Sequence, residues 1–457
     1  MTDPNEPSRN LVSWLRNLFR PKRPRPPVRT NREAETLRVQ LGLIRRAFGE
    51  KVGVASGRGG KGGDYDADVD YLYRPGHALV RPEGADRLRR FFEERQDVYR
   101  GPGDTVGQPV EGLFIYQLPR RITVGKTDTL DTLTEIDREL GEGVAVPDHV
   151  LYVVGNTGKA CPATEPELPV ASAGPVPSLS GDTDAGQGVR VSVVDTGWYP
   201  GAATDTDSPW LAQGVAGDVE TVDPNNIHPY AGHGTFVAGV VRCMAPATEI
   251  EVEGFLTKGG AIYESEIAQE LNEALRDKDE PQLISISAGT HTRRNLPLMG
   301  FQALADAYRL RERDDGPLVV AAAGNDGNDV PFYPAAFEWV VSVGALDGDG
   351  KKSDFSNYGK WVDVYAHGRN LVNAYPTGAY TYHEPTSAGF GTTQNFTGLA
   401  QWSGTSFSTP VVTGAIAAYM SKHGVSARQA RDALIAAAPK KPDPTAGTVT
   451  QLGPPFM

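Results

Sequence analysis

The chain has few of the features that mark disulfide-stabilised or membrane-spanning proteins. Its 457 residues include only two cysteines, Cys161 and Cys243, which are too few for a disulfide framework. No run approaches the roughly 18 apolar residues that a membrane span requires. The apolar stretch "LVSWLRNLF" is short, is interrupted by Arg16 and has no small-residue cleavage site after it. We therefore expect a cytoplasmic protein with no membrane span, although unconventional export would leave the same pattern.

Positive charge is also scarce. The 45 Lys and Arg residues face 57 Asp and Glu residues, so the net charge is −12 and the main body is not expected to bind nucleic acid. The first thirty residues differ from the rest, because they hold seven basic residues against two acidic ones. This Pro- and Arg-rich segment predicts a disordered basic tail, with a weak amphipathic surface helix as the alternative.

Changes in composition divide the chain into a small and a large domain with linkers. A helix pattern, "EAETLRVQLGLIRRAF", precedes a Gly-rich run that lacks the spacing of a phosphate-binding loop. Alternating strand and helix patterns then predict a small α+β domain, and a Pro/Ala/Gly-rich linker follows. The predicted segments are a basic tail (1–30), a helix and Gly-rich linker (31–63), the small domain (64–155), the second linker (156–186), the large domain (187–440) and a loosely structured C-terminal tail (441–457).

The large domain has the pattern of an α/β fold. Short Val- and Ile-rich runs such as "VRVSVVD", "QLISIS" and "PLVVAAAG" alternate with helical patterns. Strands that are apolar on both faces are typical of a parallel sheet buried between two layers of helices. We expect a doubly wound, mostly parallel sheet with helices on both faces.

Polar residues of a catalytic type follow several of these predicted elements. Asp195 ends one strand, Asn325 follows another, and His233 lies between glycines at the start of a helix. Ser406 stands just before an apolar helix, whose first turn we expect to hold Pro410. Taken singly, each of these residues has a structural explanation as a helix cap or a turn residue.

Together the four residues match the needs of acyl transfer. A serine hydroxyl becomes a nucleophile when an imidazole takes its proton, and a carboxylate fixes the imidazole tautomer. An amide donor then stabilises the oxyanion. Because the carboxyl ends of parallel strands gather at one edge of a sheet, we expect Asp195, His233, Asn325 and Ser406 to meet there.

The motifs around these residues, "DTG", "HGTFVAG", "AAAGNDG" and "GTSFSTP" in this order, resemble the subtilisin family of serine proteases. The resemblance covers about residues 189–423. It implies an Asp195–His233–Ser406 triad with Asn325 in the oxyanion hole. It also implies that the strand "SISAG" offers main-chain hydrogen bonds to an extended peptide, with a buried sheet strand as the alternative. The substrate-binding residues would be Ser285, Ser287, Ala288 and Gly289.

The sequence departs from the family pattern beside two triad members. The family commonly has Met-Ala after the serine, where this chain has Phe407 and Ser408, and often His where Phe236 stands. No cofactor is expected for catalysis and no metal site is assigned. Family members often bind structural calcium, but the acidic stretches "DGDGKKSDFSNYG" and "DTDSP" are better explained as solvated turns than as calcium loops.

The small domain ends in "VAVPDHVLYVVG", which resembles the closing strand of subtilisin-type propeptides. That resemblance implies a ferredoxin-like domain that acts as an intramolecular inhibitor of a latent precursor, with a cut site in the second linker. A permanent accessory domain is the alternative. The expected partner is a polypeptide substrate. A catalytically silent binding module and a maturation protease with a single partner remain competing hypotheses.

Overall fold

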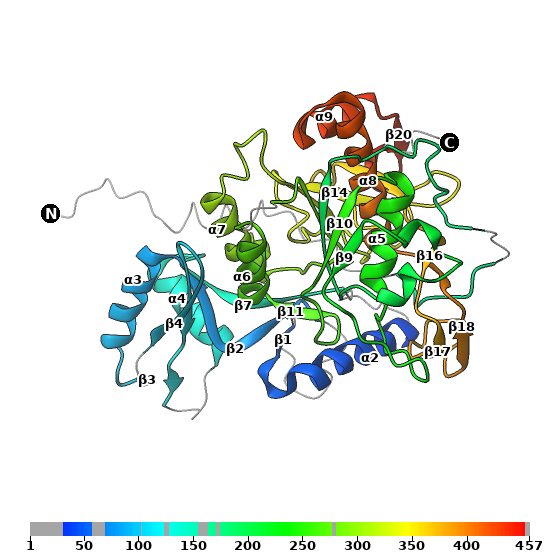
Figure 1. Ribbon diagram of the computed structural model, residues 1–457. Coiled ribbons are helices and arrows are strands. Elements are labelled where there is room, and N and C mark those ends of the chain that lie inside the picture. Colours follow the sequence, from blue (N-terminus) through cyan, green and yellow to red (C-terminus); the bar gives the residue numbers. More distant parts are fainter. Residues whose placement is uncertain are drawn as a thin grey trace.

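The computed structural model describes residues 31–56, 69–101, 103–122, 128–153, 163–170, 174–276 and 280–452. The predicted basic tail, most of the Gly-rich run and Cys161 lie outside these ranges. Figure 1 shows a small unit, containing β2 to β7, beside a large unit that begins at β8. No helix in the described ranges is both long and apolar enough to cross a lipid bilayer.

The large unit is built on a parallel sheet, as the sequence predicts, and this sheet has seven strands. Their order across the sheet is β15-β14-β13-β12-β8-β10-β9, and every registered pair is parallel. The strands are β8 (Arg190–Asp195), β9 (Val215–Gly217), β10 (Glu249–Gly254), β12 (Leu283–Ile286), β13 (Leu318–Ala322), β14 (Val341–Leu346) and β15 (Val364–His367).

Alternate residues of these strands enter two separate hydrophobic cores. Val191 and Val193 pack in a core with helices α5 (His233–Met244) and α8 (Thr405–His423). Val194 points to the other face, where α6 (Glu264–Ala274) and α7 (Met299–Ala307) contribute. Because successive strand residues point to opposite faces, helices on both faces require strands that are apolar throughout.

The strand order fixes where a site can form. On one side of β8 lie β10 and then the edge strand β9, and on the other side β12 to β15 follow in chain order. Ligand sites in such sheets lie at the carboxyl ends of the strands where the strand order reverses. Here those strands are β8 and β12, which end at Asp195 and just before Ser287.

The small unit has a ferredoxin-like arrangement. Its antiparallel strands lie in the order β7-β2-β5-β4, with two helices between them in the chain. Strand β4 escapes the sequence patterns because Gly107 and Pro109 interrupt its alternation. The elements are β2 (Tyr71–Val80), α3 (Pro82–Glu93), β4 (Asp104–Val110), β5 (Leu113–Gln117), α4 (Thr129–Leu140) and β7 (Ala145–Tyr152), with β3 (Tyr99–Arg100), β6 (Arg120–Arg121) and β1 (Gly53–Ala55) at the edges.

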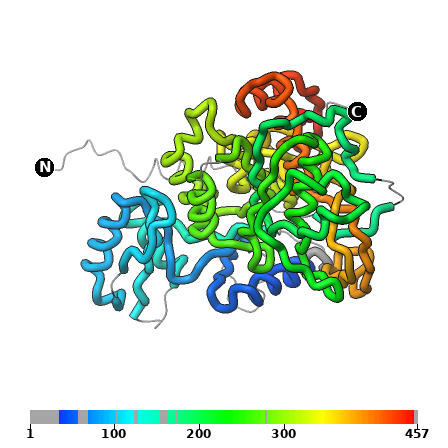
Figure 2. The backbone as a smooth tube through the Cα atoms, in the orientation of Figure 1, coloured from blue at the N-terminus to red at the C-terminus, as the bar shows by residue number. Residues whose placement is uncertain are grey.

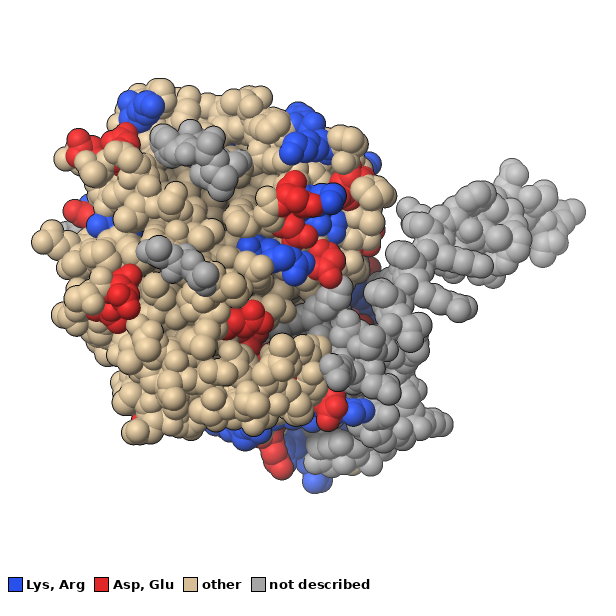
Figure 3. Space-filling view, turned by 90° about the vertical axis from the view of Figure 1, so that its right-hand side faces the viewer, with Lys and Arg blue, Asp and Glu red and all other residues tan. Residues whose placement is uncertain are grey.

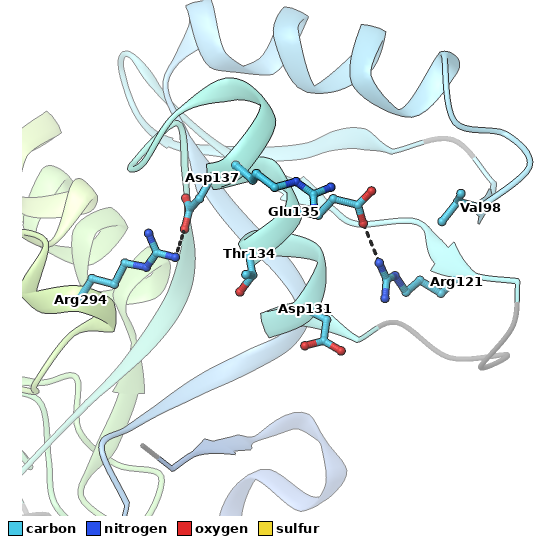
Figure 4. Close-up of a pocket in the computed structure, with 8 residues that line it drawn as sticks. Val98, Arg121, Asp131, Thr134, Glu135, Asp137 and Arg294 are labelled. Atoms are coloured by element: carbon cyan, nitrogen blue, oxygen red, sulfur yellow. Dashed lines mark hydrogen bonds and ion pairs between the residues drawn. The ribbon is translucent and has the colours of Figure 1, made fainter. Parts of the chain in front are cut away.

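The two units share a sheet edge and a charged contact. Strand β7 pairs antiparallel with β11 (Ala261–Tyr263) of the large unit. Close by, Arg293 Nη1 lies 2.5 Å from Asp137 Oδ2, and Arg294 Nη2 lies 3.3 Å from the same oxygen. Figure 4 shows Arg294 reaching to α4 beside an open, charged hollow. None of the predicted catalytic residues lines this hollow.

Helix α2 (Asn31–Phe48) belongs structurally to the large unit rather than to a free linker. Its Leu37, Leu41 and Ile44 are buried in the core that also contains Tyr230. Phe48 meets Tyr263 of β11 edge-on at 5.0 Å. Figures 1 and 2 show α2 running beneath the large unit toward β17 and β18. The apolar stripe of α2 is therefore covered by the large unit, the part of the chain in which the sequence predicts the active site.

Four further pairs of elements complete the large unit. The expectation of a loosely structured tail at 441–457 is wrong for residues 441–450, which belong to an antiparallel hairpin that begins at Lys440 and whose Val449 packs on Tyr365. The elements are β16 (Leu371–Ala374) with β19 (Leu399–Trp402), β17 (Gly378–Thr381) with β18 (Thr393–Phe396), β20 (Lys440–Asp443) with β21 (Gly447–Thr450), α9 (Ala427–Ala437) after α8, and 3₁₀ turns at Gly49–Lys51, Pro200–Ala203, Pro209–Leu211 and Arg293–Asn295.

On the face shown in Figure 3, acidic and basic side chains are scattered in small groups.

Candidate active site

Asp195 and His233 meet at the carboxyl edge of the sheet. His233 Nδ1 lies 2.7 Å from Asp195 Oδ1, and both side chains are fully buried. The helix start must approach the strand closely, because a Cβ on Gly234 would lie 2.5 Å from the Gly197 carbonyl oxygen. Glycine after the histidine is therefore a requirement of this contact.

The other imidazole nitrogen is available for chemistry. Nδ1 donates to the carboxylate, so Nε2 of a neutral His233 is the basic nitrogen. Nε2 is buried and has no hydrogen-bond partner among the described residues. The His233 ring lies 5.1 Å from the ring of Phe407, the residue that follows Ser406. The imidazole is thus held beside the start of α8.

Ser406 is the second residue of α8 and is not its cap. The helix begins at Thr405, within the predicted range, and Gly404 is the capping position. Ser406 Oγ lies 3.3 Å from the carbonyl oxygen of Ser287. The interpretation of Ser406 as a plain helix cap is wrong, because Gly404 holds the capping position and Ser406 lies inside the first turn.

Pro410 shapes the main chain at this serine. It lies in the second turn of α8 rather than in the first turn as expected, so the carbonyl of Ser406 lacks its normal intrahelical donor. The hydroxyl of Ser287 donates to that carbonyl instead, at 2.9 Å. The end of strand β12 therefore replaces the hydrogen bond that the proline removes.

The side-chain amide of Asn325 is oriented by Thr405, the first residue of α8. Its Oδ1 accepts from both the backbone N–H and the hydroxyl of Thr405, each at 2.9 Å. Its Nδ2 is buried and has no partner among the described residues. A buried amide donor without an acceptor is costly, so its persistence here indicates a ligand oxygen. The sequence patterns did not single out Thr405, although it lies next to Ser406.

The two departures from the family pattern contact each other. The rings of Phe236 and Phe407 lie 4.6 Å apart, and both pack against Trp402. Trp402 also meets His233 edge-on at 5.5 Å. These side chains form an aromatic layer behind the imidazole, so the two substitutions act as one packing unit.

The predicted substrate-binding residues divide into two groups. Ser285 lies inside β12, where β8 and β13 take its main chain on both sides, and its hydroxyl contacts Thr413 at 3.4 Å. The prediction that Ser285 offers main-chain groups to a peptide is wrong, because the sheet already uses them. Ala288 and Gly289 lie beyond the end of β12, and Gly289 is where another strand pairs.

The strand paired with Gly289 is the end of β7 from the small unit. The Tyr152 N–H donates to the Gly289 carbonyl at 3.1 Å, and the Gly289 N–H donates to the Tyr152 carbonyl at 3.2 Å. The next residue, Val153, donates to the carbonyl of Gly260 at 2.9 Å. The end of β7 therefore lies between the main chain at Gly289 and the main chain at Gly260, where it pairs as an added β-strand.

A second segment lies on the other side of Ser406. The Ala163 N–H donates to the carbonyl of Ser403 at 2.7 Å, and Glu167 forms an antiparallel bridge with Gln401 of β19. Trp402 Nε1 donates to the carbonyl of Thr164 at 2.6 Å. The sequence predicted a linker without structure here, but residues 163–167 extend β19 as a neighbouring strand.

One side chain anchors this second segment. Glu165 is buried and accepts from the Tyr380 hydroxyl at 2.7 Å and from the Ser387 hydroxyl at 2.5 Å. It also accepts from the backbone N–H groups of His383 and Glu384, at 2.9 and 3.1 Å. Helix α2 joins the same cluster, since Gln40 Nε2 donates to Glu384 Oε1 at 2.7 Å. Burial, and then the Glu165 charge, raise the pKa of Glu384 to about 8.

Another buried carboxyl borders the catalytic pair and was missed by sequence reasoning. Glu220 Oε2 accepts from the N–H of Gly232, next to His233, at 2.8 Å. Burial raises its pKa to about 8, with a further contribution from the Asp195 charge. Nothing in the local sequence distinguishes Glu220 from a surface glutamate, because its burial depends on the loop that precedes α5.

The acidic stretch at residues 347–359, one of the two compared with calcium loops, has its carboxylates bonded to protein groups. Asp347 Oδ1 lies 2.5 Å from Arg369 Nε and also accepts from Ser353, while Asp354 pairs with the same arginine. Across the described ranges, no group of three or more His, Cys, Asp or Glu side chains is placed to hold a metal ion.

Comparison with known proteins addresses the fold and this site. The subtilase family model matches residues 186–453, which is more than half of the chain. The chain belongs to the subtilase family. The matched range contains all seven strands of the parallel sheet. Family membership does not by itself assign the individual residues.

Two curated relatives from bacteria illustrate the extent of the likeness. A thermophilic serine proteinase of Bacillus sp. (strain AK1) is 30% identical over 262 residues, covering 54% of this chain and 56% of that protein. Thermitase of Thermoactinomyces vulgaris is 32% identical over 265 residues, covering 55% of this chain and 82% of that protein. The chain thus spans little more than half the length of the first relative. Among solved structures, a cold-adapted subtilisin-like serine proteinase is 22% identical, covers 60% of this chain and 91% of its own, and superposes with a TM-score of 0.44.

Proposed function

We propose that this subtilase hydrolyses peptide bonds, with Ser406 as nucleophile, His233 as general base and Asp195 as the carboxylate that orients the imidazole. The carboxylate accepts from Nδ1, so Nε2 is the nitrogen that takes the hydroxyl proton as Ser406 attacks. The negative charge of Asp195 then stabilises the imidazolium. His233 returns the proton to the leaving amine, and water hydrolyses the acyl-enzyme by the same route.

Asn325 is the proposed oxyanion donor. Its amide oxygen is held by Thr405, which leaves Nδ2 to donate to the oxygen of the tetrahedral intermediate. The supporting observation for the whole proposal is this buried Nδ2 together with the buried His233 Nε2, because both polar atoms have no acceptor or donor among the described residues. Substrate oxygen and nucleophile hydroxyl would supply those missing partners.

The test is covalent labelling with a fluorophosphonate, which reacts with activated serine hydroxyls. The full chain is incubated and sampled until labelling is constant, beside the Ser406→Ala chain. We expect labelling that maps to Ser406 and is absent from Ser406→Ala, with equal circular dichroism spectra for the two proteins. Absence of labelling in the unmodified chain, or equal labelling of both, would refute the proposal.

We further propose that the full chain is a latent precursor. The observation that supports this is the strand pairing of Tyr152 with Gly289, which uses main-chain groups that an extended substrate would need. Residues 163–167 use the edge at Ser403 and Gln401 in the same way. A substrate must displace both segments before it can lie beside Ser406.

Latency predicts a lag and a cut. Fluorophosphonate labelling of the full chain should begin slowly and accelerate, and N-terminal sequencing should find a new terminus between residues 156 and 186. The Ser406→Ala chain should stay intact under the same conditions. Immediate and complete labelling of an uncut chain would instead support a permanent accessory domain.

A further inference from the structure

The ring of Phe332 lies between two backbone segments of the candidate site. A Cβ built on Gly289 would lie 2.4 Å from Phe332 Cε1, and one built on Gly324 would lie 3.1 Å from Phe332 Cδ1 and Cγ. Such distances mean that the ring is in direct contact with both glycine backbones. Phe332 itself is only 1% exposed. The space between these two segments is therefore filled by an aromatic side chain.

The two segments flank the point where an acyl group would be held. Gly289 lies two residues after Ser287, whose carbonyl contacts the Ser406 hydroxyl, and Gly324 precedes Asn325. A peptide paired with the edge at Gly289 would bring its reacting carbonyl to Ser406, with the carbonyl oxygen at Asn325. The side chain of that same residue then enters the space between the two segments, because its N–H and carbonyl directions are already taken.

We propose that Phe332 limits this subsite to small side chains, so that the enzyme cleaves after residues such as glycine, alanine or serine. This inference deepens the proposed peptide hydrolysis and depends on it. Glycine at both walls leaves room for a flat ring, and the ring then excludes a second ring or a long aliphatic chain. Phe332 is a specificity-determining residue here and takes no part in the chemistry.

The ring is held from both sides of the chain, so it cannot easily swing away. Its neighbour Tyr333 is paired with Thr290 through two backbone hydrogen bonds of 2.8 and 2.9 Å. The ring of His291 meets Phe332 edge-on at 5.2 Å. His291 in turn contacts Asp326 Oδ2 and the Pro331 carbonyl, each at 3.0 Å. Because Pro331 and Tyr333 are both held by hydrogen bonds, the Phe332 ring between them is fixed in place, and a fixed ring excludes large side chains more strictly than a mobile one.

The test compares two peptide p-nitroanilides that are identical except for the last residue, which is Ala in one and Phe in the other. Both substrates are assayed with unlabelled full chain that has been incubated for the time at which a parallel sample reaches its fluorophosphonate labelling plateau. We expect kcat/KM for the Ala substrate to exceed that for the Phe substrate by at least about tenfold, the usual scale of steric discrimination in a pocket. In Phe332→Gly the ratio should fall by about tenfold or more. Phe332→Leu, a milder change that keeps the core filled, should give an intermediate ratio.

The matched control is Phe301→Ala, which also removes a buried phenyl ring but lies on α7. It should lower the melting temperature without moving the Ala-to-Phe ratio. Equal hydrolysis of both substrates by the unmodified chain, or a ratio that neither Phe332 variant changes, would overturn the proposal while leaving the hydrolysis intact. The fluorophosphonate carries no side chain for this subsite, so its labelling reports on hydrolysis alone. A chain that never labels would overturn the proposed function and this inference with it.

Discussion

The strand that pairs with Gly289 belongs to a folded unit, whereas the segment that lies along Gln401 and Ser403 belongs to a stretch of chain between units. The end of β7 arrives with a ferredoxin-like sheet behind it and with several side-chain contacts to the large unit. Residues 163–167 have no domain of their own, and one carboxylate with four hydrogen bonds anchors them. The first covering, the end of β7, is supported by the contacts of a whole domain. The second covering, residues 163–167, has a few main-chain hydrogen bonds and one strongly bonded side chain, Glu165. The second should therefore be the easier one to break by a single substitution.

Glu165→Ala should have the largest effect. It leaves the buried Tyr380 hydroxyl and two backbone N–H groups without their acceptor, which should cost about 3–5 kcal/mol of unfolding free energy. Thermal unfolding in the Ser406→Ala background measures this without interference from self-cleavage. In the active background, the lag before fluorophosphonate labelling should shorten. Glu167→Ala removes a half-buried carboxylate from the same segment and should change both measurements little. Equal effects of the two substitutions would show that Glu165 is not the anchor.

The same cluster should make the second covering sensitive to pH. Burial beside Glu165 raises the pKa of Glu384 to about 8, so the folded protein holds a proton there that the unfolded chain releases near pH 4.5. Stability from this group is greatest below pH 4.5 and is lost as the pH rises through 8. The groups that face Glu384 are Glu165 from the covering segment and Gln40 from α2.

Glu384→Gln isolates this contribution. It keeps an acceptor for Gln40 but cannot ionise, so the melting temperature of the Ser406→Ala chain should fall less between pH 5 and pH 9 in the variant. Other buried carboxyl groups, such as Glu220, titrate equally in both chains and cancel from the comparison. Parallel curves of melting temperature against pH would contradict the assigned role of Glu384.

A substitution in the first covering should have a smaller effect, because the small unit has several side-chain contacts with the large unit. Asp148 on β7 accepts from the Ser265 N–H at 2.9 Å and from its hydroxyl at 2.7 Å, in the first turn of α6. Loss of a cap of this kind costs about 1–2 kcal/mol. Asp148→Ala should lower the free energy of unfolding by that amount, as measured by thermal unfolding, but leave the lag before labelling nearly unchanged, since β7 still pairs with β11. Asp86→Ala, an exposed aspartate on α3, is the matched control. A lag as short as in Glu165→Ala would show that the two coverings do not differ.

The sequence could predict residues that stand in local motifs but not residues whose partners are distant in the chain. Asp195, His233, Asn325 and Ser406 could be singled out as candidates because each stands in a short motif after a strand or at the start of a helix. The parallel sheet could be predicted because β12, β13 and β14 are buried on both faces, whereas β9 and β10 expose part of their residues. Glu165 and Phe332 could not be predicted, because their roles depend on groups distant in the chain. Gln40 and Glu384, for example, are 344 residues apart, and no local periodicity reports such a contact.

The smallest effect is expected for a substitution at Ser287, the residue that directly follows β12. Its hydroxyl donates to the carbonyl of Ser406, which Pro410 leaves without an intrahelical donor. Ser287→Ala should cost about 1 kcal/mol in unfolding free energy, because one buried carbonyl loses its hydrogen bond. It should also slow fluorophosphonate labelling a few-fold, since the backbone of the nucleophile is less firmly held. Ser285→Ala is the matched control, because it removes a buried hydroxyl from the same strand whose partner is Thr413. If both variants lost stability but only Ser287→Ala slowed labelling, Ser287 would be a positioning residue; equal labelling rates would reduce it to a structural one.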